Sequence, residues 1–238
     1  MFFSEECLFL NATCNLKCLS CQSWPFDKKQ AFKSLIDTGR FYTKFKTAAT
    51  YNILGGNPLL HDELYELLQF LKSEHKYIRL WINPMFQIDE LLLYKEFVDE
   101  CLIFFPAAET PSYQAFNGVQ DLSACVSNLS DLRSEGLDFR LHTFVNDLLI
   151  SELPDHVEFC LSHRFPLLLH YQTNSFTADE KKSIHYFSTH ASVRVVGVGF
   201  YPDKYSCIVP VYDPSFAYRY QYSILKSKMR RIADSFRV

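Results

Sequence analysis

The stretch CLFLNATCNLKCLSC, residues 7–21, begins as an apolar run and ends with three cysteines within eight residues. The run at 7–11 is short and contains large apolar side chains, which is typical of a buried β-strand. Cys14, Cys18 and Cys21 follow it with the spacing CxxxCxxC. The stretch therefore predicts a strand that leads directly into a compact loop carrying three thiols.

Apolar runs of the same kind recur along the chain. Further candidate strands lie at 51–54, 77–82, 101–105, 139–145, 165–171 and 193–200. Amphipathic stretches separate them, with helical stripes of apolar residues at 32–45, 60–71 and 122–132. This alternation favours an α/β fold with a parallel sheet, open or rolled towards a barrel, and with helices packed outside. A chain of 238 residues fits one such domain.

Capping and turn residues mark the ends of several expected helices. The stripe at 122–132 stops near Gly136, a residue type favoured just after a helix. Thr177 and Glu180 have the spacing of a capping box, which predicts a helix start. The region 106–118 is expected to be the longest irregular stretch before the C-terminal region.

The composition is that of an ordinary globular protein. The chain is 48% hydrophobic and 21% charged, and none of its apolar runs approaches the roughly 18 residues needed to cross a bilayer. Residues 1–6 lack the features of a signal peptide, so a cytoplasmic protein without membrane contact is expected. The net charge of −3 disfavours nucleic-acid binding. Six basic residues gather at 219–237, where helical apolar spacing suits docking on the body, with RNA or DNA contact as the alternative.

The three clustered cysteines have the chemistry of a metal site. Three thiolates can hold three irons of a [4Fe–4S] cubane and leave the fourth iron open to an exogenous ligand. Structural zinc and iron sites usually take four protein ligands, and no second CxxC follows in the sequence. Three alternatives remain open: Cys7 as a fourth ligand, a zinc loop completed by a distant residue such as His61, or three cysteines that are close by chance.

Glycine is scarce, yet two adjacent glycines follow the second candidate strand. The segment ILGGNPLL at 53–60 places Gly55, Gly56, Asn57 and Pro58 at this strand end. Glycine there lets the backbone approach another molecule closely, although an ordinary tight turn before a helix is the alternative. Ligand sites in folds of this type gather at the carboxyl ends of the strands, where both motifs fall.

Together, CNLKCLSC after the first strand and GGNPLL after the second resemble the two leading motifs of the radical S-adenosylmethionine (SAM) superfamily. The resemblance implies a partial (β/α)6 TIM-like barrel over residues 1–200. A short C-terminal strand and helix extension at 201–238 would pack on the same domain. It also implies that Cys14, Cys18 and Cys21 hold a [4Fe–4S] cluster whose open iron binds SAM.

By the same resemblance, the turn after the second strand binds the SAM amino group. Gly55, Gly56 and Asn57 would contribute backbone contacts, and Pro58 would fix the turn. Two positions depart from the family's pattern: Asn57 replaces the common glutamate, and serine precedes the last cysteine where an aromatic residue is usual. The serine is Ser20, and the aromatic residue usual at this position packs near the adenine of SAM. Trp24 or Phe26, just downstream, would take over this packing.

The candidate strand at 139–145 carries a polar row. Arg140, His142 and Phe144 share one face because side chains alternate along a strand. His142, with Asn83 at the end of the third candidate strand, is expected to line the cofactor site. Other polar residues near strand ends are Glu109, Asn146, His170, Gln172 and Asn174.

The remaining cysteines are isolated. Cys101, Cys125 and Cys160 fall at apolar positions and are expected to pack in the core. Cys207 lies in a tyrosine-rich stretch. It is either an edge-strand residue or a residue that donates a hydrogen or holds an intermediate, as cysteines do in some members of the family.

The implied reaction is reductive cleavage of SAM to methionine and a 5′-deoxyadenosyl radical, which abstracts a substrate hydrogen. A low-potential electron donor such as flavodoxin or ferredoxin would be the partner. The absence of a second cysteine group argues against auxiliary clusters. A peptide or protein side chain is the expected substrate. The alternatives are a small heterocyclic metabolite, a role as an activase, a non-catalytic iron–sulfur or zinc-binding protein, and a nucleic-acid-binding adaptor.

Overall fold

The computed structural model describes residues 5–10, 13–16, 18, 48–117, 122–145, 149–172, 176–198 and 207–208. Its strands form one parallel sheet in the order β7-β6-β5-β4-β3-β2-β1-β8. The strands are β1 (Glu5–Phe9), β2 (Thr50–Leu54), β3 (Tyr77–Ile82), β4 (Glu100–Phe104), β5 (Phe139–Val145), β6 (Leu167–Gln172), β7 (Val193–Val198) and β8 (Cys207–Ile208).

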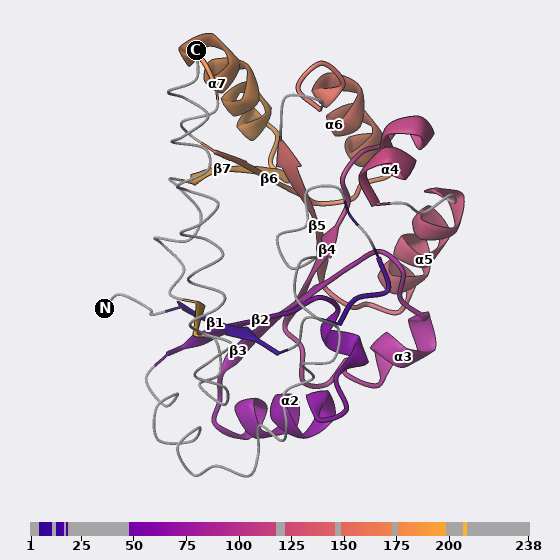
Figure 1. Cartoon of the computed structure of the whole chain (residues 1–238), viewed down its shortest axis with the longest axis vertical. Coiled ribbons are helices and arrows are strands. Elements are labelled where there is room, and N and C mark those ends of the chain that lie inside the picture. Colours follow the sequence, from indigo (N-terminus) through magenta and orange to yellow (C-terminus); the bar gives the residue numbers. More distant parts are fainter. Residues whose placement is uncertain are drawn as a thin grey trace, which may run out of the picture.

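Helices connect the successive strands from β2 to β7 and lie on one side of the curved sheet (Figure 1). They are η1 (Pro58–Leu60), α2 (Leu64–Ser73), α3 (Ile88–Leu92), α4 (Thr110–Asn117), α5 (Leu122–Ser134), α6 (Leu153–Ser162), α7 (Ala178–Tyr186) and η2 (Phe187–Thr189). The predicted α/β partial barrel is confirmed, with β8 as a short C-terminal strand beside β1. Among the described residues, none of the helices is long and apolar enough to cross a membrane.

The sheet has two faces of different character. In-register partners of parallel strands point to the same side, so Asn52, Arg79 and Glu100 share the inner face, away from the helices. The outer face carries apolar side chains such as Leu80 and Cys101, which belong to the core under the helices. The core therefore lies between sheet and helices, while the inner face carries most of the polar side chains.

All seven strands predicted by range are present in the predicted order, and β8 is an eighth, within the expected C-terminal extension. The strands β3 and β5 have the predicted bounds, and the ends of the others differ by one or two residues. The prediction of an irregular stretch at 106–118 is wrong, because α4 occupies most of it. Tyr113 and Phe116 are buried there three positions apart, one turn of a helix that begins at a proline-containing first turn. The stripe at 32–45 and the C-terminal helix lie outside the described residues.

Three helices, α2, α5 and α6, end in the same hydrogen-bonded turn. In each, the two residues after the cap donate N–H bonds to carbonyls three and five positions earlier. The first of these residues has positive φ: 57° at His75, 70° at Gly136 and 55° at Arg164. This left-handed conformation is easy for glycine and costly for the other two residues. Gly136 confirms the predicted end of α5. Histidine and arginine are not typical of this position, so His75 and Arg164 do not predict the ends of α2 and α6 from the sequence.

Substitutions at this turn position should change stability in opposite directions. Gly136→Ala is expected to destabilise the fold by about 1 kcal/mol through backbone strain alone, because a Cβ there would meet nothing within 4 Å. His75→Gly should stabilise it by up to about 1 kcal/mol. Urea unfolding midpoints measure both changes. Gly136→Asn serves as the control, since asparagine tolerates the conformation, and a loss in Gly136→Asn as large as that in Gly136→Ala would contradict the strain argument.

Candidate functional site

The loop after β1 carries two of the three predicted cluster ligands within the described residues. Cys14 and Cys18 are reduced thiols and both are half-buried. The Cys14 sulfur accepts a hydrogen bond from the Leu16 N–H, with 3.4 Å between nitrogen and sulfur. The third predicted ligand and the residues considered for adenine packing lie outside the described residues: Cys21, Ser20, Trp24 and Phe26.

The turn after β2 is joined to this loop through the main chain. The Asn57 N–H donates to the carbonyl of Thr13, the residue before the first cysteine, at 2.7 Å. Asn57 is only 2% exposed, and its Oδ1 accepts the Leu59 N–H at 3.3 Å, which caps η1. Pro58 occupies the first turn of η1, where its lack of an N–H costs nothing. The two predicted motifs therefore meet at one point of the sheet's carboxyl edge.

Asn83, just after β3, completes a network of side-chain amides at the same edge. Its Nδ2 donates to Asn15 Oδ1 at 2.6 Å and to Cys14 Sγ at 3.6 Å. The same Asn15 oxygen accepts from Asn57 Nδ2 at 3.2 Å. Met85 closes the network: its N–H donates to Asn83 Oδ1 at 2.9 Å and its carbonyl accepts from Asn15 Nδ2 at 3.2 Å. The ends of three consecutive strands are thereby held together.

The amide network contains one residue that sequence reasoning missed. Asn57 and Asn83 were expected at this edge, and Cys14 contacts Asn83 directly. Asn15 was not expected there, because a single asparagine in a loop is usually a turn residue. Its position between two predicted ligands, Cys14 and Cys18, was the only available sign.

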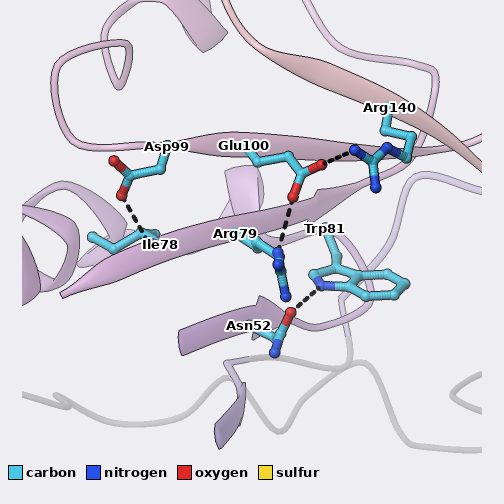
Figure 2. A network of polar contacts seen from close by, with 7 residues as sticks. All are labelled: Asn52, Ile78, Arg79, Trp81, Asp99, Glu100 and Arg140. Carbon is cyan, nitrogen blue, oxygen red and sulfur yellow. Dashed lines mark hydrogen bonds and ion pairs between the residues drawn. The ribbon is translucent and has the colours of Figure 1, made fainter. Parts of the chain in front are cut away.

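Further along the inner face, towards the amino ends of the strands, lies an ion-pair cluster (Figure 2). Glu100 Oε2 accepts from Arg79 Nε at 2.9 Å, and its Oε1 lies 3.4 Å from the guanidinium of Arg140. Glu100 is 8% exposed, and a carboxylate so buried requires partners of opposite charge. Arg140 thus lies on the predicted inner face, where it pairs with Glu100 of the neighbouring strand β4.

A layer of aromatic and imidazole rings lies beyond the ion pairs. His142 Nε2 and His170 Nδ1 are 2.7 Å apart, and the Trp81 ring packs edge-on against His142 with centroids 4.7 Å apart. The Trp81 Nε1–H donates to Asn52 Oδ1 at 3.1 Å (Figure 2). Within the part of the chain that the structure describes, His142 contacts this layer and Phe144, and makes no hydrogen bond to the amide network.

Burial keeps both imidazoles neutral. It lowers the pKa of His170 to about 4, helped by the charge of Arg194, and lowers the pKa of His142 well below its ordinary value, helped by His170. Two neutral rings joined nitrogen to nitrogen must supply one donor and one acceptor to their shared bond. The remaining ring nitrogens are then one acceptor and one donor, which suits the pair to an uncharged polar group.

The zinc alternative gains no support from the described residues. The His61 Nδ1 accepts the Glu63 N–H at 3.1 Å. Within the described ranges, His61 does not join Cys14 and Cys18 in a group of metal-ligating side chains.

The cysteines predicted to pack in the core do so. Cys101, Cys125 and Cys160 are at most 1% exposed. Burial raises the pKa of these thiols to about 12, 11 and 12, so they stay protonated at neutral pH. Cys207 lies in the edge strand β8, in register with Cys7 of β1.

Comparisons with known proteins support the fold. No family model matches the chain, and no curated protein matches its sequence. SuiB from Streptococcus suis, solved bound to S-adenosylmethionine, matches with a TM-score of 0.68 and 15% identity over 85% of this chain and 53% of that one. The protein anSMEcpe with bound AdoMet and the Kp18Cys peptide matches with a TM-score of 0.60 and 11% identity over 80% and 63%. Methylornithine synthase (PylB) gives 0.52 and 12% over 71% and 53%.

The chain therefore shares its fold with these proteins, which have radical SAM folds, as the resemblance found in the sequence predicts at the level of the fold. SuiB has also been solved with its precursor peptide SuiA, with a TM-score of 0.65 to this chain. The chain spans about half the length of SuiB, covering 50% of that protein in one of its crystal structures.

Proposed function

We propose that this chain is a radical SAM enzyme that acts on a peptide or protein side chain. The observation that carries the proposal is the direct connection between the two motifs, the Asn57 N–H bond to Thr13 together with the amide network around Asn15. The three cysteines would leave one iron of the cluster without a protein ligand. In this arrangement, a molecule bound to that iron would lie beside the backbone of the turn after β2.

The donor set of the loop fits a [4Fe–4S] cluster. Cys14 and Cys18 are reduced and accessible enough to ligate, in contrast to the buried, protonated core thiols. Cys21 would be the third ligand. Hydrogen-bond donors already surround Cys14, which is the usual environment of a cluster thiolate. When bound, cluster and SAM supply reductive cleavage of SAM to a 5′-deoxyadenosyl radical for hydrogen abstraction.

The protein's own part is to bind and orient SAM and to keep water away from the reaction. Asn57 is held by its cap and by Asn15, so the backbone of this turn is preorganised for the SAM amino group. His142 would line the inner side of the site, with Trp81 and His170 excluding water. The residues proposed to bind SAM are Gly55, Gly56, Asn57, Pro58, Asn83 and His142.

The substrate and partners are proposed from likeness to other proteins. SuiB with its precursor peptide SuiA has this fold, which supports a peptide substrate here. A low-potential donor such as flavodoxin or ferredoxin would supply the electron, and both proteins would be cytoplasmic. Residues 1–200 would form the partial barrel, and residues 201–238 an extension packed on it.

Anaerobic reconstitution tests the proposal. The purified chain should bind about four irons and form 5′-deoxyadenosine from SAM and a reductant. Adding cell extract separated by size should stimulate this reaction through the peptide and protein fraction, with a mass change in one component. Zinc in place of iron, or a cluster that never cleaves SAM, would contradict the enzyme assignment. Stimulation by the small-molecule fraction alone would instead favour a metabolite substrate.

A further inference from the structure

The Cys14 sulfur lies in a more specific environment than ligation alone requires. Two N–H groups point at it, the Leu16 backbone at 3.4 Å and the Asn83 side chain at 3.6 Å. The first comes from the loop itself, as is common for a turn around a thiolate. The second crosses from the end of β3, so a residue 69 positions away reaches this sulfur.

The Asn83 amide has its orientation fixed by its partners. A side-chain amide offers two N–H donors and one oxygen acceptor. In Asn83 the nitrogen donates to Asn15 Oδ1 and to Cys14 Sγ, while the oxygen accepts the Met85 N–H. A flipped amide would bring its oxygen against the Asn15 oxygen and its nitrogen against the Met85 N–H. Asn83 is 6% exposed, so water could not compensate for such a flip.

We propose that Asn83 is a positioning residue that donates an N–H···S hydrogen bond to the Cys14 thiolate of the cluster and thereby raises the cluster's reduction potential. This inference rests on the proposed function. It gives Asn83 a role through Cys14 in addition to lining the SAM site.

The direction of the effect follows from charge. Reduction adds an electron to the cluster, and part of the added negative charge resides on the ligating sulfurs. A hydrogen bond to an ionised acceptor is stronger than one to a less charged acceptor. The Asn83 bond therefore stabilises the reduced cluster more than the oxidised one, and hydrogen bonds to sulfur are among the factors that set such potentials.

The test compares the midpoint potential of the cluster in the reconstituted wild-type chain with the potentials in the Asn83→Leu and Asn15→Ala variants. Electron paramagnetic resonance during a redox titration measures each potential. Asn83→Leu should shift the ratio of reduced to oxidised cluster about tenfold towards oxidised, a potential about 59 mV more negative for one electron. Asn15→Ala loosens the same network but keeps the donor at the sulfur, so its potential should stay close to that of the wild type. Equal potentials in Asn83→Leu and the wild type, or equal shifts in the two variants, would overturn the inference.

A second measurement needs only the wild-type chain. With asparagine side-chain amides labelled with nitrogen-15, the reduced cluster should show a magnetic coupling to one labelled nitrogen. A reduced cluster without this coupling would overturn the role of Asn83, even if Asn83→Leu failed to retain iron. A wild-type chain that binds no cluster would instead contradict the proposed function itself, so the two failures are distinguishable.

Discussion

Cys14→Ala, Cys18→Ala and Cys21→Ala are each expected to abolish 5′-deoxyadenosine formation, because a cubane held by three thiolates has no spare protein ligand. Iron content should fall from about four per chain to a small fraction of that value. The fold should survive, because Cys14 and Cys18 are half-buried in a loop outside the core between sheet and helices. Iron analysis, the product assay and circular dichroism together measure these three outcomes.

The core cysteines provide a matched control. Cys160 is fully buried on α6, and burial raises its pKa to about 12, so it is not a ready metal ligand. Cys160→Ala should lose about 1–2 kcal/mol of stability through the cavity it leaves, while retaining iron and product formation. If the Cys14, Cys18 and Cys21 variants kept the wild-type iron content and activity, the assignment of the cluster to this loop would be wrong.

Mild acid should destabilise the fold strongly through buried histidines, and His156 shows why. It is 1% exposed on α6, and burial lowers its pKa from 6.5 to about 4. The Thr143 hydroxyl donates to the Phe105 carbonyl at 2.6 Å, so it must accept from His156 Nε2 at 3.0 Å. The other nitrogen, Nδ1, is buried without a hydrogen-bond partner in the described part of the chain, so a proton there would be uncompensated.

The sign of the effect follows from proton binding. Between pH 6.5 and 4 the unfolded chain holds more protons on His156 than the folded chain, so stability is lost as the pH falls through this window. His156 alone should account for about 2 kcal/mol between pH 7.5 and 5. His170, whose pKa is also lowered to about 4, adds to the loss in the same window.

Urea unfolding at pH 7.5 and pH 5 measures this loss. His156→Gln can still donate to Thr143 but cannot be protonated, so it should recover about 2 kcal/mol of the difference between the two pH values. His163→Gln is the control. His163 lies on the surface at the end of the same helix, and its replacement should leave the pH difference nearly unchanged. A His156→Gln variant with the wild-type pH dependence would contradict the role of His156.

The fold was predictable because its strands are buried apolar runs separated by amphipathic helices. The face of β5 was predictable as well, since His142 and Phe144 do share the inner side with Arg140. The two leading motifs were recognisable because each has an unusual composition, three close thiols and two adjacent glycines in a glycine-poor chain. Asn83 was predicted to lie at this edge of the sheet because it follows the third candidate strand.

Other features depend on contacts between distant residues. The role of Asn15 exists only because the ends of β2 and β3 approach it, and nothing local in the sequence distinguishes it from a turn residue. The partnership of His142 with His170 likewise requires the register of β5 and β6. The left-handed residues His75 and Arg164 are held by the hydrogen-bonded turns after their helices, against their own preference.

The alternation of side chains in the sheet determines which thiols a radical on the inner face could reach. Thiol hydrogens are weakly bound, so they are easily lost to a carbon radical. Cys101 points from β4 to the helix side of the sheet, and Cys125 and Cys160 lie on helices that cover this side. If the proposed radical forms on the inner face, the backbone of the sheet would separate it from these three thiols, so their hydrogens would not quench it.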